Sequence, residues 1–295
     1  MSISPSLNRI VCVNLDIRIW SGQKKLRPED LNLSKEQQIP QSVASLGVKK
    51  VCDPKQLKTF LNIRRAAERE CMAVGVKFLG GYAIPQVDTA GLSNRLDELK
   101  ERFNELKANF LSDYEFRCEQ WIETLPQDWQ HIVKEAIQDK DSVSNSLKFN
   151  YQTFKVDEID GLNTGLEKEV NTLEDRLFKD IRDMATHSYK TSFEGRSESS
   201  QRALRPLKHI QKKLNGLYFL SDDIHTIQSG LQSLFDQLPM SGPITGIYRS
   251  MVVGELERLM RVGIPDRPPE PEQLPAYEET SEAPQEENLE EGQWF

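Results

Sequence analysis

The sequence predicts a mainly α-helical protein: a long, antiparallel, coiled-coil-like helical bundle with a small N-terminal α+β module and a disordered acidic C-terminal tail. Three observations lead to this fold class: two long apolar seams at helical spacing, a short alternating run near the N-terminus, and an abrupt change of composition after residue 264. A composition of 37% hydrophobic and 28% charged residues suits long helices bathed in solvent. We expect three parts, residues 1–86, 87–264 and 265–295.

Alternation near the N-terminus predicts a half-buried strand. Valine, leucine and isoleucine occupy every second position from Val11 to Ile19, and polar residues fall between them. Pro28 followed by two acidic residues predicts a short helical turn, and the stretch SLGVKK predicts a second extended piece. Asp53 and Pro54 predict the start of a helix. The apolar stripe of that helix is expected at Leu57, Phe60, Leu61, Ala67, Cys71 and Val74.

The stretch VGVKFLGGYAIP, residues 74–85, could be either a phosphate loop or a turn. A phosphate loop follows a strand and opens a helix, with a Gly-Lys-Ser/Thr ending. Here the predicted helix comes first and that ending is missing. We therefore expect Gly75 to end the helix in the left-handed conformation, and Gly80 and Gly81 to be the central residues of a hairpin turn.

From Asp88 onward the apolar residues recur at steps of three and four, which predicts helices. The first seam is Leu92, Leu96, Leu99, Phe103, Leu106, Phe110, Tyr114, Cys118 and Trp121, and the second is Leu162, Leu166, Val170, Leu173, Leu177, Ile181 and Met184. The first seam predicts one helix of roughly 35 residues, and we expect the two long helices to pack on each other as an antiparallel pair closed by shorter helices.

Two segments lie between the seams. Residues 126–139 predict a short helix with Trp129, Ile132, Val133 and Ile137 facing inward. Residues 147–156 are predicted to be extended, although a continued helix also fits their pattern.

Charge divides the chain unevenly. The net charge is −8 overall, with +7 in residues 1–80, −6 in residues 81–264 and −9 in residues 265–295. The last segment also holds six prolines, so it has little to bury and is predicted to be disordered. Four widely spaced cysteines, no apolar run of membrane-spanning length and no signal-peptide pattern lead us to expect a cytoplasmic protein.

No pattern in the sequence predicts catalysis, a cofactor or a metal site. The four histidines (His131, His187, His209 and His225) lie on separate predicted helices, without the spacing of metal ligands. The cysteines fall at core spacing and resemble small hydrophobic residues, and there is no nucleophile elbow. We therefore predict that the protein is not an enzyme.

Two surfaces are candidates for binding a partner. The basic head carries Lys24, Lys25, Arg27, Lys49, Lys50, Arg64 and Arg65, which could hold phosphates or an acidic partner if they converge. Isolated, solvated lysines and arginines are the alternative. The tail ends with Trp294 and Phe295 beyond a run of acids, a pattern that favours anchoring in a partner's pocket, although such a tail could serve solubility alone.

The segments IRIWSGQKKLRPEDL, SLGVKKVCDP and VGVKFLGGYAIP resemble the hallmark segments of an uncharacterised family of bacteria, phages and mobile elements, the domain of unknown function number 3150. Family members resemble one another most over the equivalent of residues 8–156, which includes FNYQTFKV, and diverge in the helical second half. The resemblance implies a gene neighbourhood with a MoxR-type AAA+ ATPase and sometimes a von Willebrand factor A protein. No catalytic residues are established for the family, so none is carried over.

Two functions are therefore expected from different classes. The first is a non-enzymatic helical interaction or adaptor protein, acting as accessory to a MoxR-type AAA+ ATPase or a von Willebrand factor A protein. The alternative is a nucleic-acid-associated protein of a phage or mobile element, which binds through the basic head while the acidic tail competes for the same surface. A homo-oligomer also fits, because seams of this length could pair two copies as well as two helices of one chain.

Overall fold

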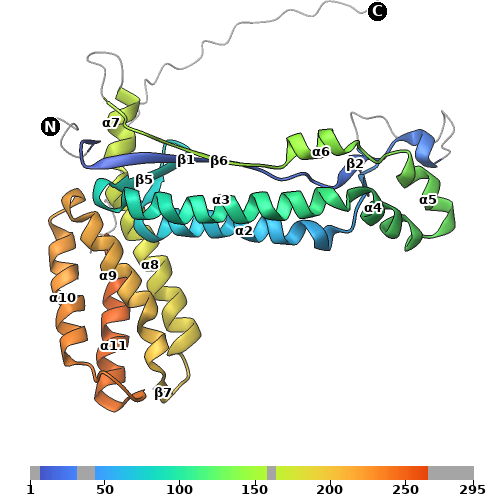
Figure 1. Cartoon of the computed structure of the whole chain (residues 1–295). Coiled ribbons are helices and arrows are strands. Elements are labelled where there is room, and N and C mark those ends of the chain that lie inside the picture. The colour runs from blue at the N-terminus through green and yellow to red at the C-terminus, as the bar shows by residue number, and fades with distance from the viewer. Residues whose placement is uncertain (1–6, 32–43, 158–163, 265–295) are drawn as a thin grey trace, which may run out of the picture. The chain divides into compact units, whose positions relative to one another are not determined.

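The computed structural model describes residues 7–31, 44–157 and 164–264 and confirms a mainly helical chain with a small sheet (Figure 1). The described residues from 7 to 263 belong to one compact unit. The predicted acidic tail, residues 265–295, lies outside the described residues. The expected boundary after residue 86 falls inside the compact unit.

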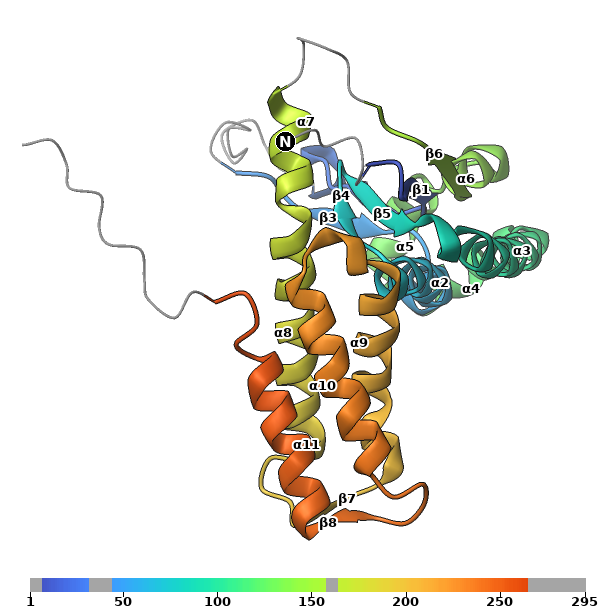
Figure 2. The ribbon, with the colours of Figure 1, turned by 90° about the vertical axis from the view of Figure 1, so that its left-hand side faces the viewer.

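Four antiparallel strands form the main sheet, in the order β4-β5-β1-β6 (Figure 2). Their bounds are β1 Ile10–Arg18, β4 Val76–Phe78, β5 Gly81–Pro85 and β6 Lys148–Phe154. β6 runs along β1 from the pair Cys12 and Phe154 to the pair Arg18 and Lys148. The extended prediction for residues 147–156 is therefore confirmed, and it brings a strand from beyond residue 86 into the sheet.

The sheet separates two hydrophobic cores. On one face, Val13 and Ile17 of β1 join a core with the helices α2 (Pro54–Val74) and α3 (Thr89–Ser112). On the other face, Ile10 and Cys12 join the core of the C-terminal helices. The alternation predicted for β1 is thus correct, and the start of the strand is apolar on both faces because both are covered.

Helix α2 begins as predicted. The Asp53 carboxylate accepts the N–H of Lys55 at 2.9 Å, and Pro54 occupies the first turn, where it gives up no hydrogen bond. Its buried residues are Leu57, Phe60, Ile63, Ala67, Cys71 and Val74. The expectation for Leu61 is wrong, because this side chain is 40% exposed and Ile63 turns inward in its place.

The turn reading of residues 74–85 is correct, but the roles of its glycines differ from the prediction. Gly75 is extended (φ −131°) and is not a left-handed terminator. A Cβ there would overlap the Ala83 carbonyl oxygen, so close packing on β5 requires glycine. The positive-φ turn residues are Leu79 (φ 46°) and Gly80 (φ 74°), one position earlier than expected. Gly81 begins β5, where a Cβ would overlap the Val13 carbonyl oxygen.

The single helix of roughly 35 residues is wrong, because the chain bends at Asp113. Helix α3 ends at Ser112 and α4 (Tyr114–Glu123) follows. The Ser112 hydroxyl donates to the Asn109 carbonyl at 2.9 Å, a competing bond that favours bends in helices. The apolar seam nevertheless continues through the bend, with Phe103, Phe110 and Cys118 all buried.

Short elements complete the N-terminal half: β2 Gln23–Lys25, the 3₁₀ turn η1 Pro28–Leu31, β3 Val48–Lys50, the 3₁₀ turn η3 Gln86–Asp88, α5 Gln127–Lys134 and α6 Lys140–Ser146. Helix α5 buries Ile132 and Val133 as predicted, and Ile137 is half-buried just beyond its end. Trp129 is 38% exposed, so its inward placement is wrong.

The C-terminal half is helical. Its elements are α7 Thr164–Asn171, α8 Leu173–Ser192, β7 Glu198–Ser199, η4 Gln201–Leu204, α9 Arg205–Gly216, η5 Tyr218–Leu220, α10 Asp223–Gln237, β8 Ile244–Thr245 and α11 Gly246–Leu259. Helices α8 to α11 pack around one core, each against its two neighbours (Figures 1 and 2). None of the helices described is both long and apolar enough to cross a lipid bilayer.

The two long seams do not pair with each other as predicted. Helix α3 packs on α2 and on β6, whereas α8 packs on α9, α11 and β4. Their side chains accordingly belong to different cores. The first seam packs mainly on the preceding helix, whereas the second packs on two later helices and on a strand of the N-terminal half. Leu162, the first residue of the second seam, lies outside the described residues.

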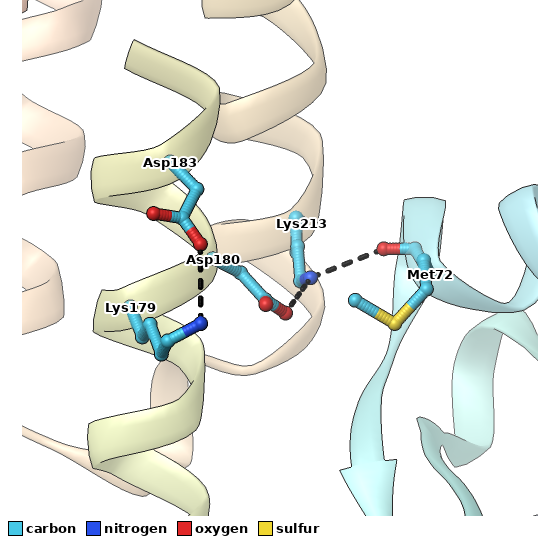
Figure 3. A network of polar contacts seen from close by, with 5 residues as sticks. All are labelled: Met72, Lys179, Asp180, Asp183 and Lys213. Carbon is cyan, nitrogen blue, oxygen red and sulfur yellow. Dashed lines mark hydrogen bonds and ion pairs between the residues drawn. The ribbon is translucent and has the colours of Figure 1, made fainter. Parts of the chain in front are cut away.

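A buried lysine joins α9 to the N-terminal half. The Lys213 ammonium contacts the Asp180 carboxylate of α8 at 2.7 Å and donates to the Met72 carbonyl of α2 at 3.1 Å (Figure 3). Met72 lies in the last turn of its helix, where carbonyls lack helical partners and a cation is favoured. Burial lowers the pKa of Lys213, and the Asp180 charge opposes that effect.

Candidate functional site

Four of the predicted basic residues meet at one end of the N-terminal half. Strand β2 pairs with β3 so that Lys24 lies opposite Lys49. The hydrogen bond from the Val51 N–H to the Gly22 carbonyl, 2.9 Å, fixes this register. Gly22 has φ 64°, a left-handed conformation that glycine adopts without strain. The pairing brings together cations that are 25 residues apart in the chain.

The turn η1 supplies the carboxylate that orders this cluster. Asp30 accepts the Arg27 backbone N–H at 2.7 Å and receives the Lys49 ammonium at 2.7 Å on each oxygen. Both side chains are largely buried, 10% exposed for Lys49 and 13% for Asp30. Burial alone would raise the pKa of Asp30, but the hydrogen bonds from Lys49 and Arg27 outweigh it and lower that pKa. The negative charge of Asp30 thereby compensates the positive charge of Lys49, and the ion pair holds the Lys49 side chain in place.

The opposite wall of the site comes from residues 135–138, after α5. The Trp20 indole N–H donates to the Gln138 side-chain oxygen at 2.8 Å, and the Tyr114 hydroxyl donates to the Gln138 carbonyl at 2.9 Å. The two rings also pack edge to face, with centroids 5.8 Å apart. Trp121 holds the other wall, because its indole N–H donates to the Lys50 carbonyl at 3.2 Å. Two buried aromatic side chains therefore fix one wall, and the half-buried Trp121 fixes the other.

These walls enclose a pocket of about 430 Å³, which we call the basic pocket. It is lined by Lys24, Lys25, Arg27, Asp30, Lys49, Glu135, Ala136, Ile137 and Gln138. Within the described ranges, the one ion pair formed by its cations is that of Lys49 with Asp30. Lys24, Lys25 and Arg27 therefore keep their charge available, and the pocket is suited to a carboxylate or phosphate group.

The remaining predicted basic residues do not join the pocket. Lys50 lies on β3 but does not line it, and its neighbour across the ladder is Gln23. Arg64 lies in the middle of α2, where it pairs with Glu68 at 3.1 Å and borders a separate pocket of about 170 Å³. Arg65 is exposed on the same helix. Trp294 and Phe295 lie outside the described residues.

A second concavity, of about 490 Å³, lies where η5 meets the turn after β5. The Arg9 guanidinium stands 5.6 Å from the ring centroids of both Tyr218 and Phe219. Pro85 and Val87 add apolar surface, and the Val87 side chain is 85% exposed. Sequence reasoning missed this groove, because Arg9 and Tyr218 are separated by 209 residues.

Over the described residues, His, Cys, Asp and Glu nowhere gather in the groups of three or more that could hold a metal ion. Cys12, Cys52, Cys71 and Cys118 are all buried and reduced. Burial raises the pKa of Cys12 to about 11 and those of Cys52 and Cys71 to about 12, so these thiols stay protonated and weakly nucleophilic at neutral pH.

Sequence reasoning also missed the wall formed by residues 135–138. Nothing in this short stretch signals a binding site, and it reaches the pocket through long-range contacts from Trp20 and Tyr114. A buried Trp and Tyr each need a hydrogen-bond acceptor, and this need was the one available signal.

Fold and site together define a mainly helical protein with a small antiparallel sheet and a basic surface pocket. The chain belongs to the family described as "Protein of unknown function (DUF3150)", whose sequence model matches residues 7–261. This match extends beyond the residues that carried the resemblance and includes the C-terminal helices. Neither the curated proteins nor the solved structures contain a match to the chain.

Proposed function

We propose that this protein is a non-enzymatic interaction or adaptor protein that holds an acidic group of a partner protein in its basic pocket. One observation carries the proposal: Lys24, Lys25 and Arg27 line a single pocket, with no ion pair among the described residues. The nearby Lys49 is neutralised by Asp30, which leaves Glu135 as the one other carboxylate on the lining. A net positive, preformed concavity favours an anionic ligand.

A protein partner fits this pocket better than a nucleic acid does. The cations lie together in one concavity, whereas Arg64 and Arg65 lie apart on α2. A duplex or single strand is held by a row of basic residues that follows its phosphates. One carboxylate-bearing or phosphorylated segment needs no such row. The charge of −8 over the whole chain also disfavours nonspecific binding to nucleic acid.

The partner we propose is a MoxR-type AAA+ ATPase, or a von Willebrand factor A protein, in the cytoplasm of a bacterium or of the host of a phage. Support for this choice comes from the family resemblance and its gene neighbourhood. We also propose that two copies could associate through exposed helical surface. The acidic, aromatic-ended tail is proposed as a second contact with the partner.

Charge reversal in the pocket tests the proposal. Binding of the purified full-length chain to a MoxR-type ATPase from the same organism would be measured by sedimentation velocity. We expect the double variant Lys24→Glu, Lys25→Glu to bind at least about tenfold more weakly, a loss of about 1.4 kcal/mol. The matched control, Lys190→Glu with Lys208→Glu, changes two exposed lysines on α8 and α9 and should bind as wild type. Equal binding by the pocket variant and the control would refute the pocket's role.

A nucleic-acid-binding function is the second candidate, favoured by the three pocket cations that have no ion pair within the described ranges. If each contacts one phosphate, binding to duplex DNA should weaken roughly 40-fold between about 50 and 200 mM salt. Fluorescence anisotropy with a labelled oligonucleotide measures this slope. A steep slope that the Lys24→Glu, Lys25→Glu variant abolishes would support the second function over the first.

A further inference from the structure

The two edges of the main sheet are protected very differently. The edge strand β4 has three residues, and α8 packs against it. Arg176 of α8 also donates to the Lys77 carbonyl of this strand at 3.0 Å. The opposite edge strand, β6, has seven residues and pairs on one side with β1. Among the described residues, no hydrogen bond outside that pairing reaches the backbone of residues 148–154.

Strand β6 carries one of the devices that usually block an open edge, a lysine at its first position, Lys148. Proteins protect such edges with charged side chains, with proline, with a bulge or with a covering element, because unpaired N–H and C=O groups recruit another strand. The sequence KFNYQTF contains no proline, and its pairs with β1 follow one another without a bulge. Gln152, Thr153 and Phe154 are exposed. The edge is thus long and regular enough to accept a further strand.

Lysines lie on α3 beside this edge and at the two ends of the strand. Lys107 of α3 donates to the Leu147 carbonyl at 2.9 Å, and Asp97 of α3 accepts from the Tyr151 hydroxyl at 2.8 Å, so this face of α3 runs beside β6. Helical spacing places Lys100 on the same face, between these two contacts. Lys148 begins the strand, and Lys155 follows its last residue.

The counter-charges along this border are fewer than the cations. Asp16 pairs with Lys148 at 2.9 Å, and Asp97 is the acidic residue on the bordering face of α3. Lys100 and Lys155 form no ion pair within the described ranges. Asp157 lies two residues beyond Lys155, so the four lysines (Lys100, Lys107, Lys148 and Lys155) stand against three acidic residues. The remaining positive charge favours an acidic strand over a basic one.

We propose that β6 is a docking edge for an extended, acidic segment of a partner protein, which adds to the sheet as a fifth strand. Main-chain hydrogen bonds to the β6 edge would supply the affinity, and Lys100 and Lys155 would supply the charge preference. This surface is separate from the basic pocket, since none of the pocket's lining residues belongs to β6 or α3. The two interfaces can therefore be tested independently.

The probe is a fluorescein-labelled peptide of four Glu-Val repeats, which is acidic and favours the extended state. Two peptides serve as controls: the same sequence with alternate backbone nitrogens methylated, and four Lys-Val repeats. We expect the first peptide to bind the full-length chain, and both controls to bind at least about tenfold more weakly. Hydrogen exchange should slow in residues 148–154 when the first peptide binds.

Variants locate the interface. Lys100→Glu with Lys155→Glu should weaken binding of the Glu-Val peptide at least about tenfold. The control variant Lys190→Glu with Lys208→Glu should bind the Glu-Val peptide as tightly as the wild type does. The pocket variant Lys24→Glu with Lys25→Glu should also bind it as wild type. Equal binding of the methylated peptide, exchange protection at residues 23–27 in place of β6, or no binding at about 1 mM peptide would overturn the proposal. Pairing of β6 between two copies, seen as a dimer that the peptide cannot dissociate, would overturn it as well.

Discussion

Replacing Asp180 with alanine should destabilise the protein more than replacing its partner Lys213 with methionine. The Lys213 side chain is 1% exposed, whereas Asp180 is 22% exposed. Asp180→Ala leaves an ammonium group in the core without a counter-charge, which costs about 3–5 kcal/mol in the free energy of unfolding. Lys213→Met leaves a carboxylate that water can reach and the Met72 carbonyl without its donor, which costs about 1–3 kcal/mol.

The interaction between the charges of Lys213 and Asp180 leads to two further predictions, one for the double variant and one for the pH dependence of stability. The double variant Lys213→Met, Asp180→Ala removes both charges, so it should cost at least about 1 kcal/mol less than the sum of the single changes. In Asp180→Ala the already lowered pKa of Lys213 falls further below its ordinary 10.5. The unfolded chain then binds more protons than the folded chain, so stability rises with pH. The deficit of Asp180→Ala should therefore shrink as the pH rises from neutral toward the ordinary lysine pKa of 10.5.

Urea unfolding followed by circular dichroism measures these differences. The neighbouring surface pair of Lys179 and Asp183, 3.3 Å apart and about two-thirds exposed on each side, provides a matched control (Figure 3). Asp183→Ala should change stability by less than about 0.5 kcal/mol, and so should replacement of the exposed Lys212 by methionine. The reasoning is refuted if Lys213→Met costs more than Asp180→Ala, or if the deficit of Asp180→Ala is independent of pH.

Three further predictions concern single positions. Leu79→Asn should stabilise the chain by about 1 kcal/mol in thermal unfolding, because asparagine tolerates the left-handed φ of 46° that strains leucine; an unchanged or lower melting temperature would contradict this. Gly75→Ala should lower the free energy of unfolding in urea by more than about 2 kcal/mol, since the added methyl group overlaps the Ala83 carbonyl. A change close to zero would contradict this and would show that β5 shifts to make room for the methyl group. Burial raises the pKa of Cys71 from 9.0 to about 12, so wild type loses stability as pH rises above about 9, by about 1.4 kcal/mol for this thiol at pH 10. Cys71→Ala should remove that part of the alkaline loss, and identical slopes for the two proteins would exclude it.

Local signals in the sequence predicted many elements correctly. The Asp53 and Pro54 cap fixed the start of α2, because a cap is satisfied by backbone groups two or three residues away. Alternation predicted β1 and β6, since each needs only its own period of two. The Ser112 bend was missed, because a serine within a strong apolar seam gives no sign of whether its hydroxyl will bond back to the helix.

The candidate site was predicted only in part. Seven basic residues were candidates for a binding surface on the condition that they converge, and four of them line one pocket. The pairing of β2 with β3 links Lys24 to Lys49 over a short separation, which a pattern of extended residues can indicate. The wall at Gln138 depends on Trp20, which lies 118 residues away. A contact over such a separation leaves no trace in local periodicity.

By itself, the sequence determined where most helices and strands lie and how charge is distributed along the chain. The tertiary structure decided which elements meet. It placed β6 beside β1 and the two long seams on opposite faces of the sheet. It also gathered into one pocket three cations that form no ion pair with any described residue. The physical reason is that caps, turns and periodicity depend on contacts within a few residues. The burial of an apolar face is not directional, so it requires only some complementary apolar surface. Many surfaces of this chain would have met that requirement, and the sequence pattern does not distinguish between them.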